Sequence, residues 1–302
     1  MNQSSMIPAS IASLPWKVVL LLTAIAGFGG VVLYSAAGGS VSPWAGSHAF
    51  RFSVFMVMAI GLSRIGEAQW KAVAFPGYAV VLVLLIGVEL LGAVAGGSQR
   101  WIDLGIIRLQ PSELMKLFIV LAVARFYDLL PAGEIRGWNA VWIPAILIGL
   151  PAALVMLQPD LGTALMIVAG GVTVMFLAGI PLRIFVASGA AVAIIAPLSY
   201  FFLLHDYQRR RVLIFLDPES DPLGAGYHIS QSKIAIGSGG IFGKGFLNGS
   251  QSHLDYLPEG HTDFVFATMA EEWGLFGGLL VIALYIALIR WGMNVSARSK
   301  SQ

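Results

Sequence analysis

The sequence predicts an all-α polytopic membrane protein with about eight transmembrane helices, and its composition is the first observation behind that prediction. Of the 302 residues, 57% are hydrophobic and only 11% are charged, and the mean hydropathy is +0.81. Soluble domains carry roughly 25% charged residues, so this chain has less than half of the usual share. The second observation is a series of apolar runs of about 20 residues, the length that an α-helix needs to span a bilayer.

Eight such runs follow one another along the chain. We place the spans at residues 16–35, 49–65, 72–95, 112–130, 139–157, 161–180, 183–204 and 263–290. Prolines stand mostly at or near the ends of these runs, where a missing N–H does least damage to a helix. The first run has no basic region before it and is long enough to span, so we interpret it as a span and not as a cleaved signal.

We treat residues 1–302 as a single transmembrane domain, within which residues 205–262 form a large extracytoplasmic loop. One set of short connections is richer in basic residues, among them Arg64, Lys71 and Arg136. Short cytoplasmic loops carry such an excess, so we expect a cytoplasmic N-terminus. All five histidines then fall in outer loops, which predicts that the outer face holds most of the polar chemistry.

Composition also excludes some functions. The net charge of +2 gives no argument for nucleic-acid binding, and the absence of cysteine excludes disulfides, a thiol nucleophile and thiolate metal ligands. The glycine-rich run GSGGIFGKG is no Walker A motif, because Ser238 and Gly245 stand where glycine and Ser or Thr are required. Two interpretations of this run stay open. Its backbone N–H groups could approach a pyrophosphate, or it could be a turn-rich loop packed against the spans.

Charged residues within or beside the spans are candidates for chemistry. Glu113 and Lys116 stand three residues apart on one predicted helix and share a face, so they can pair or line a polar cavity. Arg209, Arg210 and Arg211 directly follow the seventh span. They are either anchors at the level of the lipid headgroups or guanidinium groups that hold phosphate oxygens.

The stretch LPEGHTDFVFATMAEEWG joins the large loop to the last span. We expect Asp263 on the first turn of that span, where a carboxylate interacts favourably with the helix dipole. With its neighbours Glu259 and His261 it could instead form a partly desolvated carboxylate beside cationic groups, suited to accepting a hydroxyl proton. Local physics alone leaves both interpretations open.

Four separated motifs are similar to those of the shape, elongation, division and sporulation (SEDS) family. They read GSQRWIDLGIIRLQPSELMK, QPDLGTA, DPESDPLGAGYHISQSKIAIGSGG and LPEGHTDFVFATMAEEWG. They stand in the family's order, the resemblance covers about residues 16–290, and DPESDPLGAGYH is closer to the rod-elongation branch than to the division branch. The family has ten spans, so the resemblance implies that this chain lacks the last two.

The resemblance implies a peptidoglycan glycosyltransferase that polymerises lipid II on the outer face of the bacterial inner membrane. The implied partners are a class B penicillin-binding protein, which crosslinks the product, and the elongation machinery. Because the lipid II donor is α-linked and the polymer β-1,4-linked, the resemblance implies inversion by a single displacement. The alternatives are a lipid II transporter and a scaffold that only binds the penicillin-binding protein. Ionisable residues crowd the outer side of the chain, which favours outer-face chemistry over transport.

The family's motifs imply roles for individual residues. Its catalytic aspartate falls on Asp263, and its salt-bridged pair falls on Glu113 and Lys116. Its outer-loop tryptophan falls on Trp101, and the acid of its QPDLG motif falls on Asp160.

Two further expectations concern the charge of the pyrophosphate leaving group and the support of the catalytic turn. Cations stabilise such a leaving group, and the candidates are Arg100, Lys116, Arg209, Arg210, Lys233 and Lys244. A divalent cation, magnesium or manganese, could share that work. We expect Glu259 and His261 to support the turn that presents Asp263.

Overall fold

A computed structural model describes residues 14–91, 93–95, 98–103, 108–131, 133–202, 209, 212–214, 216–217, 219, 224–254, 256–257 and 259–298. The chain divides into two compact units. The terminal unit comprises Met1–Ser63 and Tyr200–Gln302, and the central unit comprises Arg64–Ser199. We describe each unit by itself, and the assignment of a single transmembrane domain stays a prediction.

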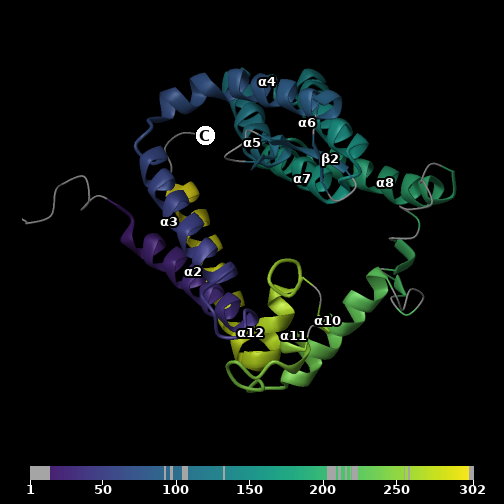
Figure 1. Cartoon of the computed structure of the whole chain (residues 1–302). Coiled ribbons are helices and arrows are strands. Elements are labelled where there is room, and N and C mark those ends of the chain that lie inside the picture. The colour runs from purple at the N-terminus through teal and green to yellow at the C-terminus, as the bar shows by residue number, and fades with distance from the viewer. Residues whose placement is uncertain are drawn as a thin grey trace, which may run out of the picture. The chain divides into compact units, whose positions relative to one another are not determined.

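The expected spans are found as helices with bounds close to those predicted (Figure 1). They are α2 (Trp16–Ala36), α3 (Trp44–Leu62), α4 (Glu67–Leu91), α5 (Pro111–Leu129), α6 (Asn139–Leu157), α7 (Leu161–Leu177), α8 (Leu182–Phe202) and α12 (Val265–Arg298). Within the described residues, six helices are long and apolar enough to cross a membrane, namely α2, α3, α4, α6, α8 and α12. The all-α polytopic class is therefore confirmed, whereas the number eight stays a prediction.

The third span ends earlier than predicted. Helix α4 stops at Leu91, and the residues that follow form a small antiparallel sheet of β1 (Ala93–Ala95), β2 (Ser98–Asp103) and β3 (Arg108–Leu109), in that order. The apolar run continues through β1 without interruption. Hydropathy alone cannot separate the end of a helix from a short apolar strand, which is why the predicted boundary at residue 95 is wrong.

Helices α4 to α7 pack together in the central unit, around residues at helical spacing. Buried members of this core include Tyr78, Val81, Leu85, Met115, Ile119, Ile148, Val155 and Ile167. Two glycines allow close approach of helices. A Cβ atom at Gly77 would collide with the ring of Phe118, and one at Gly171 would collide with Ile148. Replacement of either glycine would therefore push two helices apart.

Helix α5 carries its charges as ion pairs. Near its C-terminal end, Asp128 pairs with Arg125 on the same helix and with Lys71 of α4 at 2.9 Å. Near its other end, Glu113 pairs with Lys116. Ionisable groups within membrane segments are tolerated when they are paired, so this helix can remain a span despite its four charges.

In the terminal unit, α2 packs against both α3 and α12, and α10 (Ala225–Gly239) packs against α12 (Figure 1). The short helix α11 (Ser250–His253) contacts α10 and α12. Helix α12 is broken at Gly274, whose φ of 59° and ψ of −154° are not helical. The last span therefore consists of two segments, residues 265–273 and 275–298, and the sequence analysis did not predict this break.

Candidate active site

The turn that presents Asp263 is organised by Glu259. Glu259 has a φ of 54°, in the left-handed region that few residues other than glycine adopt. Its carbonyl accepts the N–H groups of Thr262 at 3.0 Å and Phe264 at 3.2 Å, and its carboxylate accepts the Thr262 hydroxyl at 2.9 Å. Asp263 lies just before α12 and is exposed. Its neighbours do not desolvate it as expected, and they leave its carboxylate open to a substrate.

His261, in the same turn, contacts both Trp44 and Glu259. Its ring stacks on Trp44 with the centroids 4.1 Å apart and the planes inclined by 9°. Its Nε2 lies 3.8 Å from the Glu259 carboxylate. Because Trp44 is the first residue of α3, the stack connects the turn to a second helix. These contacts support the prediction that Glu259 and His261 hold the turn that carries Asp263.

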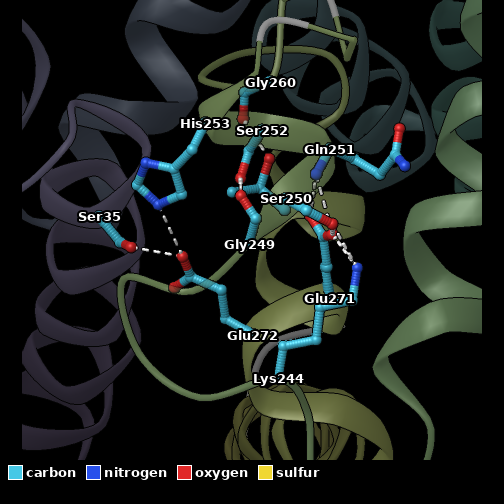
Figure 2. A network of polar contacts seen from close by, with 11 residues as sticks. Ser35, Lys244, Gly249, Ser250, Gln251, Ser252, His253, Gly260, Glu271 and Glu272 are labelled. Atoms are coloured by element: carbon cyan, nitrogen blue, oxygen red, sulfur yellow. Dashed lines mark hydrogen bonds and ion pairs between the residues drawn. The ribbon is translucent and has the colours of Figure 1, made fainter.

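Two adjacent glutamates, Glu271 and Glu272, are buried in the first segment of α12, with exposed fractions of 0% and 1%. Figure 2 shows their side chains leading to different partners. The Glu271 carboxylate accepts hydrogen bonds from the Lys244 ammonium at 2.6 Å, the Gln251 N–H at 2.9 Å and the Ser250 hydroxyl at 3.1 Å. A buried carboxylate needs a counter-ion and hydrogen bonds of this kind. The charge of Lys244 is therefore matched within the protein.

Glu272 has different partners. One of its oxygens accepts the Ser35 hydroxyl of α2 at 2.5 Å and lies 3.4 Å from Nε2 of His253 in α11 (Figure 2). Its other oxygen is buried without a hydrogen-bond partner among the described residues. Through Glu272, α11 and α12 meet α2, which is far from both in the sequence, at one polar point.

The loop at residues 239–245 pairs with the break in α12 through its backbone. The N–H groups of Lys244 and Gly245 donate to the carbonyls of Glu271 and Glu272, at 2.9 and 3.0 Å. A break in a helix leaves carbonyl groups without their usual partners, and the loop supplies donors to them. The loop and the break therefore stabilise each other.

The glycines of this loop allow that close approach. Gly243 has a φ of 79°, and a Cβ atom there would collide with the carbonyl of Glu272. A Cβ atom at Gly239 would likewise collide with the carbonyl of Ala270. Two N–H groups of the loop donate to α12 and its glycines lie against the α12 backbone, so the glycine-rich run packs against this helix, which was one of the two interpretations that the sequence left open.

In the central unit, Glu113 and Lys116 form the ion pair that their spacing predicts, with Nζ and Oε1 2.8 Å apart. The exposed fractions of the two side chains are 54% and 34%. The helices of the unit do not enclose this pair, so its polar atoms remain accessible from outside the bundle.

Arg100 and Asp160 organise the connection between α6 and α7. Arg100 donates from Nε to the Gln158 carbonyl at 3.0 Å and from Nη2 to the Pro159 carbonyl at 2.6 Å, and it lies 3.7 Å from the Asp160 carboxylate. Asp160 caps α7 by accepting the Thr163 N–H at 3.2 Å. A cation is favourable at the C-terminus of a helix and a carboxylate at the N-terminus. These contacts give both residues a structural role.

The remaining predicted residues are more scattered. Trp101 follows Arg100 on β2 and is partly exposed, and Lys233 is exposed on α10. Arg209 donates from Nη2 to the Phe201 carbonyl in α8 at 2.9 Å. Arg210 lies outside the described residues. The structure thus brings Glu259 and His261 around Asp263 within the terminal unit, while Arg100, Trp101, Glu113, Lys116 and Asp160 lie in the central unit.

The sequence analysis missed four residues of the terminal unit. Glu271 and Glu272 carried a signal, because two carboxylates within an apolar span are functional candidates by default. His253 and Trp44 carried none, since a lone histidine in a loop and a lone tryptophan at a helix start are common. Only the folded chain brings them to Glu272 and His261.

The divalent cation expected from the sequence stays a prediction. In the part of the chain that the structure describes, no three His, Asp or Glu side chains lie close enough together to hold a metal ion. We derive no chemical step through a cation.

Helices of membrane-spanning length, an exposed aspartate on a braced turn and buried carboxylates in the last span define a multi-pass membrane protein with a polar site at the ends of its helices. The model of the FtsW, RodA and SpoVE family, described as cell cycle proteins, matches residues 14–302. The chain belongs to this family.

Several known proteins are similar to the chain. Peptidoglycan glycosyltransferase MrdB of Escherichia coli K12 is 45% identical over 94% of this chain and 76% of its own length. The probable peptidoglycan glycosyltransferase FtsW of Coxiella burnetii is 37% identical over 80% of this chain and 65% of its own. A chain from a peptidoglycan synthase complex that coordinates polymerization and crosslinking has a TM-score of 0.76 at 33% identity, covering 92% of this chain and 76% of that one. The rod shape determining protein RodA of Thermus thermophilus has a TM-score of 0.67 at 27% identity, covering 96% and 77%.

Proposed function

We propose that this chain is a peptidoglycan glycosyltransferase that polymerises lipid II into β-1,4 glycan strands during cell elongation. The observation that carries the proposal is the 45% identity to the glycosyltransferase MrdB over 94% of the chain. The exposed carboxylate of Asp263, on a turn braced by Glu259, His261 and Trp44, is the group that suits the reaction best.

Asp263 acts as the general base. Its carboxylate takes the proton from the 4-hydroxyl of the acceptor sugar while that oxygen attacks the anomeric carbon of the donor. The bond between the anomeric carbon and the lipid-linked pyrophosphate breaks, and the pyrophosphate leaves with the electron pair. The attack and the departure occur on opposite faces of the sugar, so the α-linked donor becomes a β-linkage in one displacement.

The leaving group needs positive charge nearby. Lys233 is exposed on α10 in the same unit as Asp263, so it can reach a ligand outside the protein core. Lys244 is a weaker candidate because its ammonium is held by Glu271. We assign Lys244 to the support of the loop and not to the leaving group.

The reaction takes place on the periplasmic side of the bacterial inner membrane, with the N-terminus in the cytoplasm, as the distribution of Lys and Arg predicts. The similarity to a chain of a synthase complex that coordinates polymerization and crosslinking supports a crosslinking partner. That partner is a class B penicillin-binding protein within the elongation machinery.

The test is polymerisation of labelled lipid II by the purified chain, with the products separated by length. Asp263→Asn removes the base with little change in shape, and loss of a general base typically slows a reaction by about 10²- to 10⁴-fold. Glu134→Gln is the matched control, because it removes an exposed carboxylate from the connection between α5 and α6. Equal polymerisation by wild type and Asp263→Asn would rule out the assignment of the base. Movement of lipid II across vesicles without polymer formation would favour a transporter.

A further inference from the structure

We propose that Asn248 is a site of spontaneous deamidation, where the chain slowly converts an asparagine into aspartate and isoaspartate. Asn248 stands directly before Gly249, in the connection between α10 and α11. The reaction requires the side-chain amide of an asparagine to meet the backbone nitrogen of the next residue. Glycine in that next position hinders the approach least, because it has no side chain. The proposal is independent of the proposed function, since it concerns the chemistry of the chain itself.

The reaction needs no reagent other than water. The backbone nitrogen of Gly249 attacks Cγ of Asn248, the bond from Cγ to Nδ2 breaks, and the side-chain nitrogen leaves as ammonia with the proton of the Gly249 N–H. The product is a cyclic imide. Water then adds to one of the carbonyl carbons of the imide and breaks the bond from that carbon to the nitrogen. Opening at Cγ gives aspartate, and opening at the backbone carbonyl gives isoaspartate, whose main chain runs through the former side chain. Either product carries a carboxylate where Asn248 had a neutral amide.

Both reacting groups are free in the folded chain. The Asn248 side chain is exposed. Among the described residues, no hydrogen bond engages its amide and none engages the Gly249 N–H. Gly249 immediately precedes α11, and the first N–H groups of a helix have no partner within it. Attack therefore requires no hydrogen bond of either group to break first.

The backbone that leads to Asn248 is irregular and strained. No helix or strand includes residues 240–249. Leu247 has a φ of 64°, in the left-handed region that a residue other than glycine adopts only under strain. One hydrogen bond, from the Asn248 N–H to the Gly245 carbonyl at 3.1 Å, closes the turn. Opening of this turn releases the strain at Leu247, so Asn248 can rotate toward the geometry of attack at little cost.

The other asparagines among the described residues are held in place. The Asn139 side chain, at the start of α6, accepts the Nε1–H of Trp142 at 2.8 Å. The N–H of the following residue, Ala140, donates to a backbone carbonyl at 3.2 Å. Asn294 lies inside α12 and precedes Val295, whose side chain is branched at Cβ and crowds the backbone nitrogen. The chain therefore contains its own slow controls.

The modification affects the fold because Gly249 lies against the buried carboxylates of α12. A Cβ atom at Gly249 would lie 2.6 Å from Oγ of Ser252, 3.1 Å from an oxygen of Glu271 and 3.2 Å from an oxygen of Glu272. Isoaspartate lengthens the main chain by one carbon directly before this closely packed residue, and it adds a negative charge. It therefore displaces Gly249 and weakens the nearby hydrogen bond from the Gln251 N–H to Glu271. Deamidation thus loosens the outer loop.

Peptide mapping by mass spectrometry tests the site. The purified protein is incubated in mildly alkaline buffer made with water enriched in heavy oxygen, so that each deamidation during the incubation adds a labelled oxygen atom. We expect Asn248 to be modified at least about fivefold faster than Asn139 and Asn294, because a hydrogen bond that must open first accounts for a factor of about that size. Isoaspartyl methyltransferase with a labelled methyl donor detects the isoaspartate. An Asn248 peptide that is modified no faster than the other two would overturn the proposal.

The variant Asn248→Gln separates the modification from other effects of the incubation. Glutamine keeps an exposed amide at this position, but its longer side chain cyclises far more slowly, so the variant should fold and stay unmodified there. Hydrogen exchange of the Gln251 N–H measures the effect on the loop. We expect faster exchange in incubated wild type than in fresh wild type, and no change in incubated Asn248→Gln.

Modification of Asn248 with unchanged exchange at Gln251 would overturn the proposed effect on the loop. None of these measurements requires polymer formation. The deamidation site and the proposed glycosyltransferase activity can therefore be confirmed or rejected separately.

Discussion

Asp263 and Glu271 lie near the same end of α12, but their surroundings differ and suit them to different purposes. Asp263 is exposed and has its neighbours arranged around it, which suits a group that must meet a substrate. Glu271 is buried and is matched by Lys244, which suits a group that holds a loop in place. Burial and partners therefore distinguish the carboxylate that we propose as the base from the one that holds the loop.

At the residue scale, Lys244→Met should destabilise the protein strongly. It removes the counter-ion of Glu271, and leaving one partner of a buried pair alone typically costs about 3–5 kcal/mol. Denaturant titration followed by circular dichroism measures the free energy of unfolding. Lys233→Met is the matched control, since Lys233 is an exposed lysine of the same outer loop and should change stability little. Equal midpoints for both variants would show that the Lys244–Glu271 pair does not hold the loop.

At the element scale, the break in α12 and the glycine-rich loop form one unit. The loop donates backbone hydrogen bonds to the carbonyls before the break, and its glycines permit the approach. Neither the break nor the loop would be stable without the other, because a broken helix exposes unpaired carbonyls and a glycine-rich loop has little structure of its own.

The exchange of one glycine tests this pairing. Gly243→Ala forces a side chain into a left-handed conformation and against the Glu272 carbonyl, so we expect a loss of at least about 1–3 kcal/mol. Hydrogen exchange of the Lys244 and Gly245 N–H groups should accelerate. Gly237→Ala is the control, because Gly237 lies in α10 with open space around it, and alanine there should be neutral or stabilise by up to about 1 kcal/mol. Unchanged exchange in Gly243→Ala would show that the pairing is dispensable.

At the scale of the whole molecule, the orientation of the helices decides on which side of the membrane Asp263 acts. Trp44 at the start of α3 stacks on His261, so the start of α3 and the turn of Asp263 lie at the same end of the terminal unit. The direction in which α3 crosses the membrane therefore determines on which side of the membrane the candidate active site lies.

The orientation of α3 in the membrane can be measured with single cysteines, because the sequence contains no native cysteine. Ser40 and Ser63 are exposed at opposite ends of α3, and each can be replaced by a single cysteine. We expect a membrane-impermeant maleimide to label Ser40→Cys in intact cells with a permeabilised outer membrane, and Ser63→Cys only after the inner membrane is opened. The reverse pattern would place Asp263 in the cytoplasm and would contradict synthesis on the outer face.

The sequence determined the class of fold and most helix positions, because the length and hydropathy of a span follow from the thickness of the bilayer and need no tertiary contact. The helix α6 was predicted at residues 139–157, where the structure has it. The i, i+3 pairing of Glu113 and Lys116 was predictable for the same reason, since it depends only on the local geometry of a helix.

The tertiary structure decided what depends on neighbours distant in the sequence. Ser35 and Glu272 are 237 positions apart and share a hydrogen bond, and Trp44 reaches His261 from another helix. The break at Gly274 has no hydropathy signal, because it exists only with the glycine-rich loop packed against it. The same is true of the groove between α2 and α3, since two ordinary apolar helices form a groove only through the space that their small residues leave between them.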